Sequence, residues 1–265
     1  MSIVRLATLN IMSGRSIVDG RVDPTRLHTA VASLRVDVLA MQEVDRGQSR
    51  SGYVDLAAVA GGALGDGVTH RFAPAVVGVP GALFRAATVA DLDTAEAHYG
   101  VALATRWPVR SWWLTWLPPA PVPAPVFVPG PRGGRVLLLK DEPRVVLAAI
   151  IEAPIGPMTV ATTHLSFVPG WNVRQLHRTQ RALRQLPAPR FLLGDLNVPG
   201  RLLRLVSDWR MLASRPTYPT TRPRVQFDHV LLDRQGAAGI PPAQRGETPA
   251  LDISDHRPLI VELIG

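Results

Sequence analysis

The sequence predicts a mixed α/β sandwich, on two observations. Short apolar runs bounded by turn residues alternate along the chain with stretches of helical periodicity, which is typical of α/β proteins. Several of these runs are joined by turns too short to contain a helix, so hairpins are expected, and this argues against a purely parallel sheet. With 265 residues, of which 46% are hydrophobic and 19% charged, the chain can bury a sizeable core.

The first half of the chain contains predicted strands separated by helices. Residues 3–10 and 36–44 read as apolar strands with polar residues at their ends. A helix is expected between them, because Pro24 suits the first helical position and apolar residues follow at helical spacing, at Leu27, Val31 and Leu34. We expect a second helix over about 53–60 and a strand over 69–77.

The second half contains predicted hairpins and one long helix. A turn at 106–108 and another at 154–157 each join two apolar strands. Residues 171–186 have the periodicity of an amphipathic helix. Three more strands are expected, at about 191–195, 225–232 and 257–264.

The segment from 107 to 135 departs from this pattern. It contains four of the six tryptophans and the run "LPPAPVPAPVFVPGPRGG", whose proline density is incompatible with a helix or a central strand. We interpret it as a loop inserted into a single domain over residues 1–265. Three of the tryptophans would form an unusual apolar patch if they were exposed: Trp112, Trp113 and Trp116. We therefore expect them to pack beneath the loop, rather than to stack on bases or enter a membrane.

Composition narrows the class of protein further. The apolar runs are too short for a membrane span, and the N-terminus lacks the features of a signal peptide, so we expect a cytoplasmic protein and a monomer. Without cysteine, thiolate metal sites are excluded. The net charge of +8 comes almost wholly from arginine, with Lys140 the only lysine, and weakly favours acidic partners.

The motif "GDLN" at 194–197 raises the question of a site. It follows a buried apolar run, so Asp195 is placed at a strand end, where a carboxylate must be paired, bound to a metal or exposed. Taken alone, the motif is equally well explained as a turn.

Other predicted strands also begin or end in polar residues. Four of these residues end strands and three precede strands, so strands running in opposite directions would bring all seven to one edge of the sandwich. Individually, Asn10 could cap a turn, Glu43 could be a solvated strand end and His164 could be a core histidine, but the coincidence indicates a site. The seven are Asn10, Glu43, His164, Asp195, Asp228, Asp255 and His256.

The residue types match what phosphodiester cleavage requires. Hard oxygen ligands from Asn10, Glu43 and Asp255 suit Mg²⁺ or Mn²⁺ better than zinc. Cleavage also needs an oriented water and positive charge against the phosphoryl oxygens. Asp195 could take or orient the water proton, and Asn197 could donate to the phosphate or hold the nucleophile. His164 and His256 could stabilise charge or move protons, and Asp228 could fix the tautomer of His256.

Six motifs, in this order, resemble the endonuclease/exonuclease/phosphatase superfamily: "TLN", "MQEVD", "TTHLS", "GDLN", "FDHVLL" and "SDHRP". The resemblance extends over nearly the whole chain. It implies a four-layer αββα sandwich of two mixed sheets and a Mg²⁺-dependent phosphoesterase. It also implies a metal at Asn10 and Glu43, nucleophile and phosphate contacts from Asp195 and Asn197, and a pair between Asp228 and His256.

The resemblance has one gap. Members commonly carry Gly-Asn-Ala where this chain has "YGVALATRWP", so that Val101 stands in place of the amide. We expect Tyr99 or Arg144 to contact the substrate phosphate instead, while Val101 stays away from the catalytic set.

Three functions remain open at this level. A nuclease is favoured because the chain is basic, although Arg174, Arg178 and Arg181 on the long helix read as a solvated face rather than a nucleic-acid contact. A lipid or small-molecule phosphoesterase is the alternative, with the tryptophan- and proline-rich loop at an interface. A non-catalytic binding module is disfavoured by the intact set of polar residues.

Overall fold

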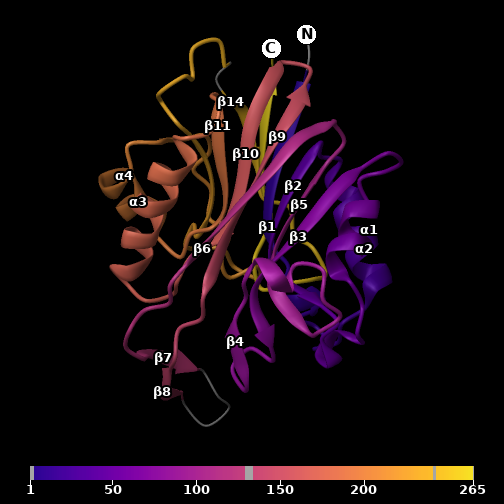
Figure 1. The fold of residues 1–265 in the computed structure, drawn as a ribbon, viewed down its shortest axis with the longest axis vertical. Coiled ribbons are helices and arrows are strands. Elements are labelled where there is room, and N and C mark those ends of the chain that lie inside the picture. The colour runs from indigo at the N-terminus through magenta and orange to yellow at the C-terminus, as the bar shows by residue number, and fades with distance from the viewer. Residues whose placement is uncertain (1–2, 129–133, 241–242, 265) are drawn as a thin grey trace.

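The computed structural model describes residues 3–128, 134–240 and 243–264, and it contains two mixed sheets packed face to face (Figure 1). The first sheet has the order β14-β15-β1-β2-β5-β3-β4 and the second β12-β13-β11-β10-β9-β6. The first sheet comprises β1 (Ile3–Asn10), β2 (Val38–Arg46), β3 (Thr69–Gly78), β4 (Phe84–Ala86), β5 (His98–Thr105), β14 (Ala243–Glu247) and β15 (Leu259–Ile264). The second comprises β6 (Val109–Leu117), β9 (Arg144–Ala153), β10 (Gly156–His164), β11 (Arg190–Asp195), β12 (Arg210–Met211) and β13 (Asp228–Leu232).

Helices cover the outer face of each sheet, which gives four layers (Figure 1). α1 (Pro24–Leu34) and α2 (Leu56–Gly62) pack on the first sheet, and α3 (Trp171–Leu183) and α4 (Gly200–Val206) on the second. Three short 3₁₀ turns complete the helical elements: Met12–Gly14, Ser49–Ser51 and Val89–Asp91. The expected αββα sandwich is therefore confirmed. Within the described ranges, no helix is long and apolar enough to cross a membrane.

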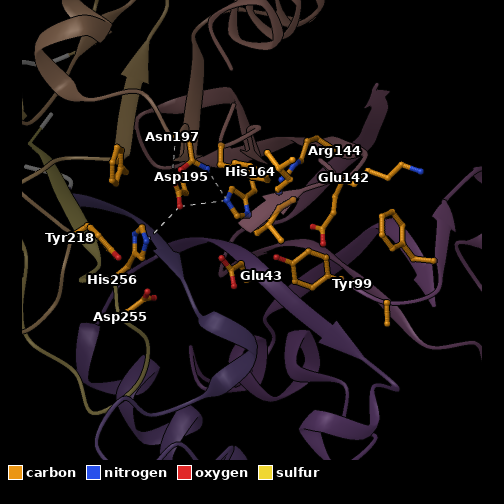
Figure 2. A pocket seen from close by; sticks show the side chains of 18 residues that line it. Glu43, Tyr99, Glu142, Arg144, His164, Asp195, Asn197, Tyr218, Asp255 and His256 are labelled. Atoms are coloured by element: carbon orange, nitrogen blue, oxygen red, sulfur yellow. Dashed lines mark hydrogen bonds and ion pairs between the residues drawn. The ribbon is translucent and has the colours of Figure 1, made fainter. Parts of the chain in front are cut away.

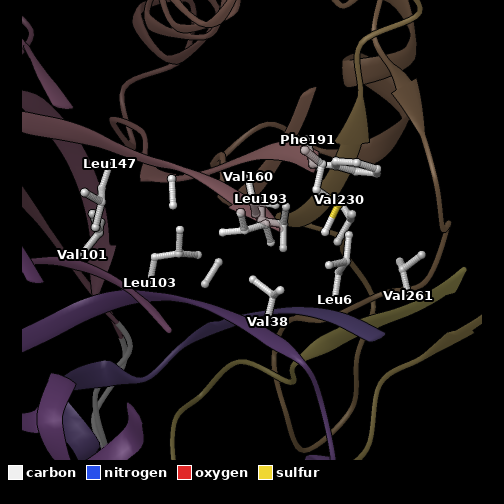
Figure 3. Close-up of a cluster of buried hydrophobic side chains, with 14 of the residues drawn as sticks. Leu6, Val38, Val101, Leu103, Leu147, Val160, Phe191, Leu193, Val230 and Val261 are labelled. Atoms are coloured by element: carbon white, nitrogen blue, oxygen red, sulfur yellow. The ribbon is translucent and has the colours of Figure 1, made fainter. Parts of the chain in front are cut away.

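The main core lies between the two sheets (Figure 3). Strand residues of alternate parity point into it, as the period of two in a β-strand requires. The labelled members in Figure 3 come from both sheets: Leu6, Val38, Val101, Leu103 and Val261 from the first, and Leu147, Val160, Phe191, Leu193 and Val230 from the second. Val101 is thus a core residue, on β5 opposite the register shift of β2 between Met41 and Val44.

The first helix forms where the sequence predicts it. Asp23 caps α1 by accepting hydrogen bonds from the backbone N–H groups of Thr25 and Arg26, at 2.8 and 3.3 Å. The predicted apolar side is buried against the first sheet, at Leu27, Val31 and Leu34. The second helix begins three residues later than expected, at Leu56, because Asp55 caps it through the Ala58 N–H.

The segment from 107 to 135 contains one strand that was expected, after the turn at 106–108, and a hairpin that was not. Residues 109–117 form β6, the edge strand of the second sheet, and β7 (Ala124–Val128) pairs with β8 (Arg135–Leu139) in a separate hairpin. Proline is tolerated there because each strand of a two-stranded ribbon has an unpaired edge. Residues 129–133 lie outside the described ranges.

The tryptophans of this segment are partly buried, but not beneath the loop. Trp112 and Trp116 pack on the core between the sheets, and Trp113 packs on the opposite face with α3. The Trp116 indole donates a 2.9 Å hydrogen bond to the Pro74 carbonyl of the first sheet. The expected position beneath the proline-rich run is therefore wrong, because the tryptophans belong to a sheet strand whose two faces both meet packed layers.

Candidate active site

Strand register places three of the predicted polar residues side by side. β10 and β11 are parallel with His164 opposite Asp195, and β11 and β13 are antiparallel with Asp195 opposite Asp228. β10 can approach β11 closely because Gly194 has no side chain: a Cβ there would lie 2.0 Å from the Thr163 carbonyl oxygen. Three residues far apart in the sequence thus meet at one end of the second sheet.

Glu43 reaches the same end from the first sheet through an irregular backbone. The pairing of β2 with β5 shifts register between Met41 and Val44, and Glu43 has a left-handed φ of 54°. Bulges of this kind redirect a side chain from the regular alternation of a strand, and they occur often beside functional sites. Asn197, with φ of 50°, and Ser254, with φ of 63°, share this backbone region.

A single amide joins the two sheets at this point. Asn10 Nδ2 donates to Glu43 Oε1 at 2.9 Å and to Asp195 Oδ2 at 3.1 Å. Its own Oδ1 accepts the Met12 backbone N–H at 3.0 Å, so Asn10 also closes a local turn. The amide nitrogen, and not the oxygen, therefore faces the carboxylates.

Asp195 lies at the centre of the site (Figure 2). Its Oδ1 accepts the Asn197 backbone N–H at 3.0 Å, which makes "GDLN" a turn and a part of the site at once. Its Oδ2 lies 3.5 Å from His164 Nε2 and 3.8 Å from His256 Nε2. The donors around it fix the orientation of the carboxylate.

His256 and Asp228 form a buried pair behind Asp195. His256 Nδ1 lies 2.8 Å from Asp228 Oδ2. Burial opposes a charge on the imidazole, but Asp228 and Asp195 outweigh it and raise the pKa of His256 to about 10. At neutral pH His256 is therefore an imidazolium, with both ring nitrogens as donors.

His164 is in the opposite electrostatic state. Burial lowers the pKa of its imidazole to about 3, in spite of the nearby Asp195. Asn197 Nδ2 lies 3.1 Å from His164 Nε2 and donates to the Leu165 carbonyl at 2.9 Å. Neutral His164 and Asn197 therefore form a fixed, uncharged wall of the site.

The two carboxylates nearest the first sheet have fewer partners: Glu43 accepts one side-chain hydrogen bond, from Asn10. Burial raises the pKa of Glu43 to about 7. The Asp255 and Asp195 carboxylates also raise it, whereas the hydrogen bond from Asn10 lowers it. Burial, chiefly, also raises the pKa of Asp255. Among the residues that the structure describes, neither carboxylate forms an ion pair.

These groups open into a cleft of about 690 Å³. Figure 2 shows Glu43, Asp195 and His164 facing its interior, with Tyr218 and His256 toward one end and Tyr99, Glu142 and Arg144 toward the other. Asp228 is fully buried behind His256 and does not line the cleft. A further group of lining residues is apolar, apart from the basic Lys140, and comes from the β3–β4 hairpin, the end of β8 and the loop after β10. They are Gly81, Ala82, Phe84, Leu138, Leu139, Lys140 and Phe167.

Tyr99 and Arg144 line the cleft as expected of phosphate contacts. Burial and the nearby Glu43 and Glu142 carboxylates raise the pKa of Tyr99 well above its ordinary value, so its hydroxyl keeps its proton. Arg144 Nη2 pairs with Asp141 Oδ1 at 3.1 Å. Its Nε is buried and has no hydrogen-bond partner in the described part of the chain.

Three polar residues that line the cleft were not predicted from the sequence: Lys140, Glu142 and Tyr218. Glu142 adjoins Arg144 in "KDEPR", where paired acids in an apolar context were a usable signal. Tyr218 packs its ring against His256, with centroids 4.8 Å apart, and "PTYP" gives no such signal. The contact arises only because the loop before β13 folds over His256.

The comparisons with known proteins agree with the fold. Residues 7–256 match the model of the Endonuclease/Exonuclease/phosphatase family. No curated protein matches the chain.

Three solved structures illustrate the likeness. An endonuclease/exonuclease/phosphatase from Beutenbergia cavernae is 19% identical, with a TM-score of 0.65 over 99% of this chain and 72% of that one. A mannosyl-6-phosphatase from Bacteroides thetaiotaomicron is 15% identical, with a TM-score of 0.59 over 99% and 100%. The human nocturnin catalytic domain, solved with bound sulfate, is 17% identical, with a TM-score of 0.55 over 99% and 93%.

At identities this low, the solved structures show only a shared fold. The family model, which matches almost the whole chain, shows the family. The chain belongs to the endonuclease/exonuclease/phosphatase family, whose members are generally hydrolases that act on phosphate esters.

Proposed function

We propose that the protein hydrolyses phosphodiester bonds with a divalent cation, Mg²⁺ or Mn²⁺, and that nucleic acid is its substrate. One observation carries the proposal: Glu43, Asp195 and Asp255 surround a cleft in which the pKa of Glu43 is raised to about 7. These carboxylates repel one another and an anionic phosphate at their end of the cleft, and a bound cation would relieve that repulsion.

The donor set suits a hard cation. Glu43 and Asp255 offer carboxylate oxygens, which Mg²⁺ and Mn²⁺ prefer. Asn10 holds Glu43 through its amide nitrogen, and would become a ligand only if its amide turned over. Bound at these residues, the cation would withdraw charge from a phosphoryl oxygen.

A second grouping also has the spacing of a metal site. Oxygen or nitrogen atoms of Asp195, Asp228 and His256 lie within 4.8 Å of one another, and all three residues are buried. His256 Nδ1 is already engaged with Asp228 Oδ2 at 2.8 Å, however, and Asp228 is fully buried and does not line the cleft. We therefore assign this triad to hydrogen bonding and charge, and the cation to Glu43 and Asp255.

The remaining polar residues have distinct roles in this proposal. Asp195 orients the attacking water and accepts its proton, since its carboxylate faces the cleft from a fixed position. His256, kept charged by Asp228, donates to a phosphoryl oxygen. Asn197 and neutral His164 contribute hydrogen bonds, while Arg144 and Tyr99 contact the phosphate group.

A different observation favours a second candidate, an amphiphilic phosphate ester. The hairpins at the far wall of the cleft expose apolar side chains: Leu83 is 87% exposed and Leu138 is 73% exposed. Leu138 and Phe84 also line the cleft itself, so an acyl or other apolar group could lie beside the phosphate. Phospholipid is the natural test substrate for this candidate.

Four substrates distinguish the possibilities: plasmid DNA, RNA, phospholipid vesicles and bis(p-nitrophenyl) phosphate. Each is incubated with purified protein and Mg²⁺, Mn²⁺ or EDTA. We expect hydrolysis of the small diester and of nucleic acid that EDTA abolishes. Hydrolysis of phospholipid alone establishes the second candidate, and no hydrolysis with any cation would leave only a binding module.

A further inference from the structure

Two adjoining hollows beside α4 are lined by arginine, and we call the two together the arginine groove. The first, of about 470 Å³, and the second, of about 390 Å³, share Arg204 and Ser214. Figure 1 places α4 on the outer side of the second sheet. Six arginines line the two hollows: Arg201, Arg204, Arg210, Arg215, Arg224 and Arg234.

The positive charge of this groove is not neutralised by neighbours. Across the described ranges, none of the six arginines forms an ion pair. The two nearest acids in the sequence are taken by other partners, since Asp208 pairs with Arg184, and Asp233 pairs with Arg190 at 3.0 Å. Arg210 has buried Nε and Nη2 atoms that lack hydrogen-bond partners among the described residues. The groove therefore has a strong and available positive potential.

The walls of the groove are held in place by hydrogen bonds. Buried Gln226 accepts the Arg215 backbone N–H at 3.1 Å and donates to the Ala213 and Asp228 carbonyls at 3.1 and 3.2 Å. Arg204 Nη2 donates to Ser214 Oγ at 2.9 Å, which ties α4 to the opposite wall. The groove is thus preformed, so a ligand need not order it.

Two segments of the chain run from the catalytic cleft to the groove. Phe227 lines the cleft and Gln226 lines the groove; Asn197 lines the cleft and Gly200 the groove. Three extended residues span at most about 10 Å, so the groove begins within that distance of Asn197. At the junction the rings of Tyr218 and Phe227 lie 5.7 Å apart.

We infer that the arginine groove binds the backbone of a nucleic-acid strand whose scissile phosphate lies in the cleft. Guanidinium groups recognise phosphate oxygens, and a cationic groove ending at aromatic rings is the common architecture for single strands. The arginines line hollows, which a single strand can enter and a flat bilayer surface cannot, although α4 also exposes Leu202 and Leu205. The inference rests on the proposed function for the reaction, but strand binding is measured independently of it.

The test compares two triple variants of equal charge. Arg201, Arg204 and Arg215 are changed to Gln in the groove variant, and Arg174, Arg178 and Arg181, which are exposed on α3, are changed to Gln in the control. Binding of a fluorescein-labelled single-stranded DNA 20-mer is measured by anisotropy in EDTA, from 50 to 200 mM NaCl. Circular dichroism and thermal unfolding verify that both variants fold.

We expect the groove variant to lose affinity by about tenfold or more, and the slope of log K against log salt to fall by about 2, at about 0.7 per lost phosphate contact. The control should keep the wild-type slope. Wild-type affinity in the groove variant, an equal loss in the control, or a groove-dependent loss of binding to phosphatidylserine vesicles but not to DNA would each overturn the inference. DNA binding without any cation-dependent diester hydrolysis would instead refute the proposed function and leave the groove standing.

Discussion

The two sides of the cleft carry the same kind of side chain in opposite states of pairing. Glu43 and Asp255 form no ion pair among the described residues, and burial raises the pKa of each. Asp195 shares the Asn10 amide with Glu43 but also accepts the Asn197 backbone N–H, and Asp228 pairs with the charged His256.

This difference assigns different tasks to the two sides. A buried carboxylate with built-in donors is part of a rigid scaffold, because its desolvation is already compensated. Glu43 has one side-chain donor, the Asn10 amide, and its raised pKa shows that this donor does not compensate its burial, so a cation from solution can remove the remaining cost. Changes to Glu43 or Asp255 should therefore act through the cation. Changes to Asp195, Asp228 or His256 should act through geometry and proton transfer.

The largest effect is expected for Glu43→Gln. The substitution keeps the shape of the side chain but removes the charge that holds the cation, so diester hydrolysis should fall by about a thousandfold or more, several kcal/mol of transition-state stabilisation. Steady-state kinetics with bis(p-nitrophenyl) phosphate measure this. Glu247→Gln, on β14 outside the cleft, is the matched control, and full activity of Glu43→Gln at micromolar Mg²⁺ would contradict the cation assignment.

Next in size are the effects of Asp195→Asn and His256→Ala. Each should lower kcat by on the order of a hundredfold, since one orients the water and the other donates to the phosphoryl oxygen. Cation affinity should change less than in Glu43→Gln, which separates the two sides of the cleft. Near wild-type turnover with unchanged circular dichroism would show that the two residues are structural.

A smaller effect is expected on the pH dependence of cation binding. Glu43 must be ionised to hold a cation, and its pKa is raised to about 7. Apparent Mg²⁺ affinity should therefore rise by about tenfold per pH unit below pH 7 and level off above it. Mg²⁺-dependent shifts in Tm, titrated from pH 5.5 to 8.5, report this affinity. A flat profile would show that Glu43 is not a ligand.

The smallest effect concerns stability above neutral pH. The folded pKa of His256, about 10, lies above its ordinary 6.5, so its contribution is complete below pH 6.5 and is lost as pH rises toward 10. Between pH 7 and 9 the loss of this proton lowers the unfolding free energy of the wild type in EDTA by on the order of 1 kcal/mol per pH unit. Urea unfolding in EDTA should show a shallower decline for His256→Asn than for the wild type. The control is His28→Asn, at an exposed position of α1, and its unfolding free energy should decline with pH as that of the wild type does.

Much of the fold was predictable because its signals are local. Pro24 after a capping Asp23, followed by apolar residues at helical spacing, predicts α1 from neighbours in the sequence. Apolar runs ending at Asn10 and Asp195 likewise predict strands with polar ends. The family resemblance then supplied the four layers, which the strand patterns alone left open.

The candidate site was predictable as a set of residues but not as an arrangement. Polar strand ends identify Glu43, His164, Asp195 and His256, yet which carboxylate is paired depends on contacts between distant segments. Asn10 and Asp195 are 185 residues apart, and their 3.1 Å hydrogen bond exists only because the two sheets face each other.

By itself, the sequence determined the features that neighbouring residues decide: the cap of α1, the alternation that buries one face of each strand, and the polar ends of the strands. Tertiary structure alone decided the bulge that turns Glu43 into the cleft, the hairpin within the proline-rich segment and the gathering of arginines from 201 to 234 along one groove. Each of these depends on pairing or packing between segments far apart in the chain, whose free energy is set by burial and by partners that no local pattern specifies.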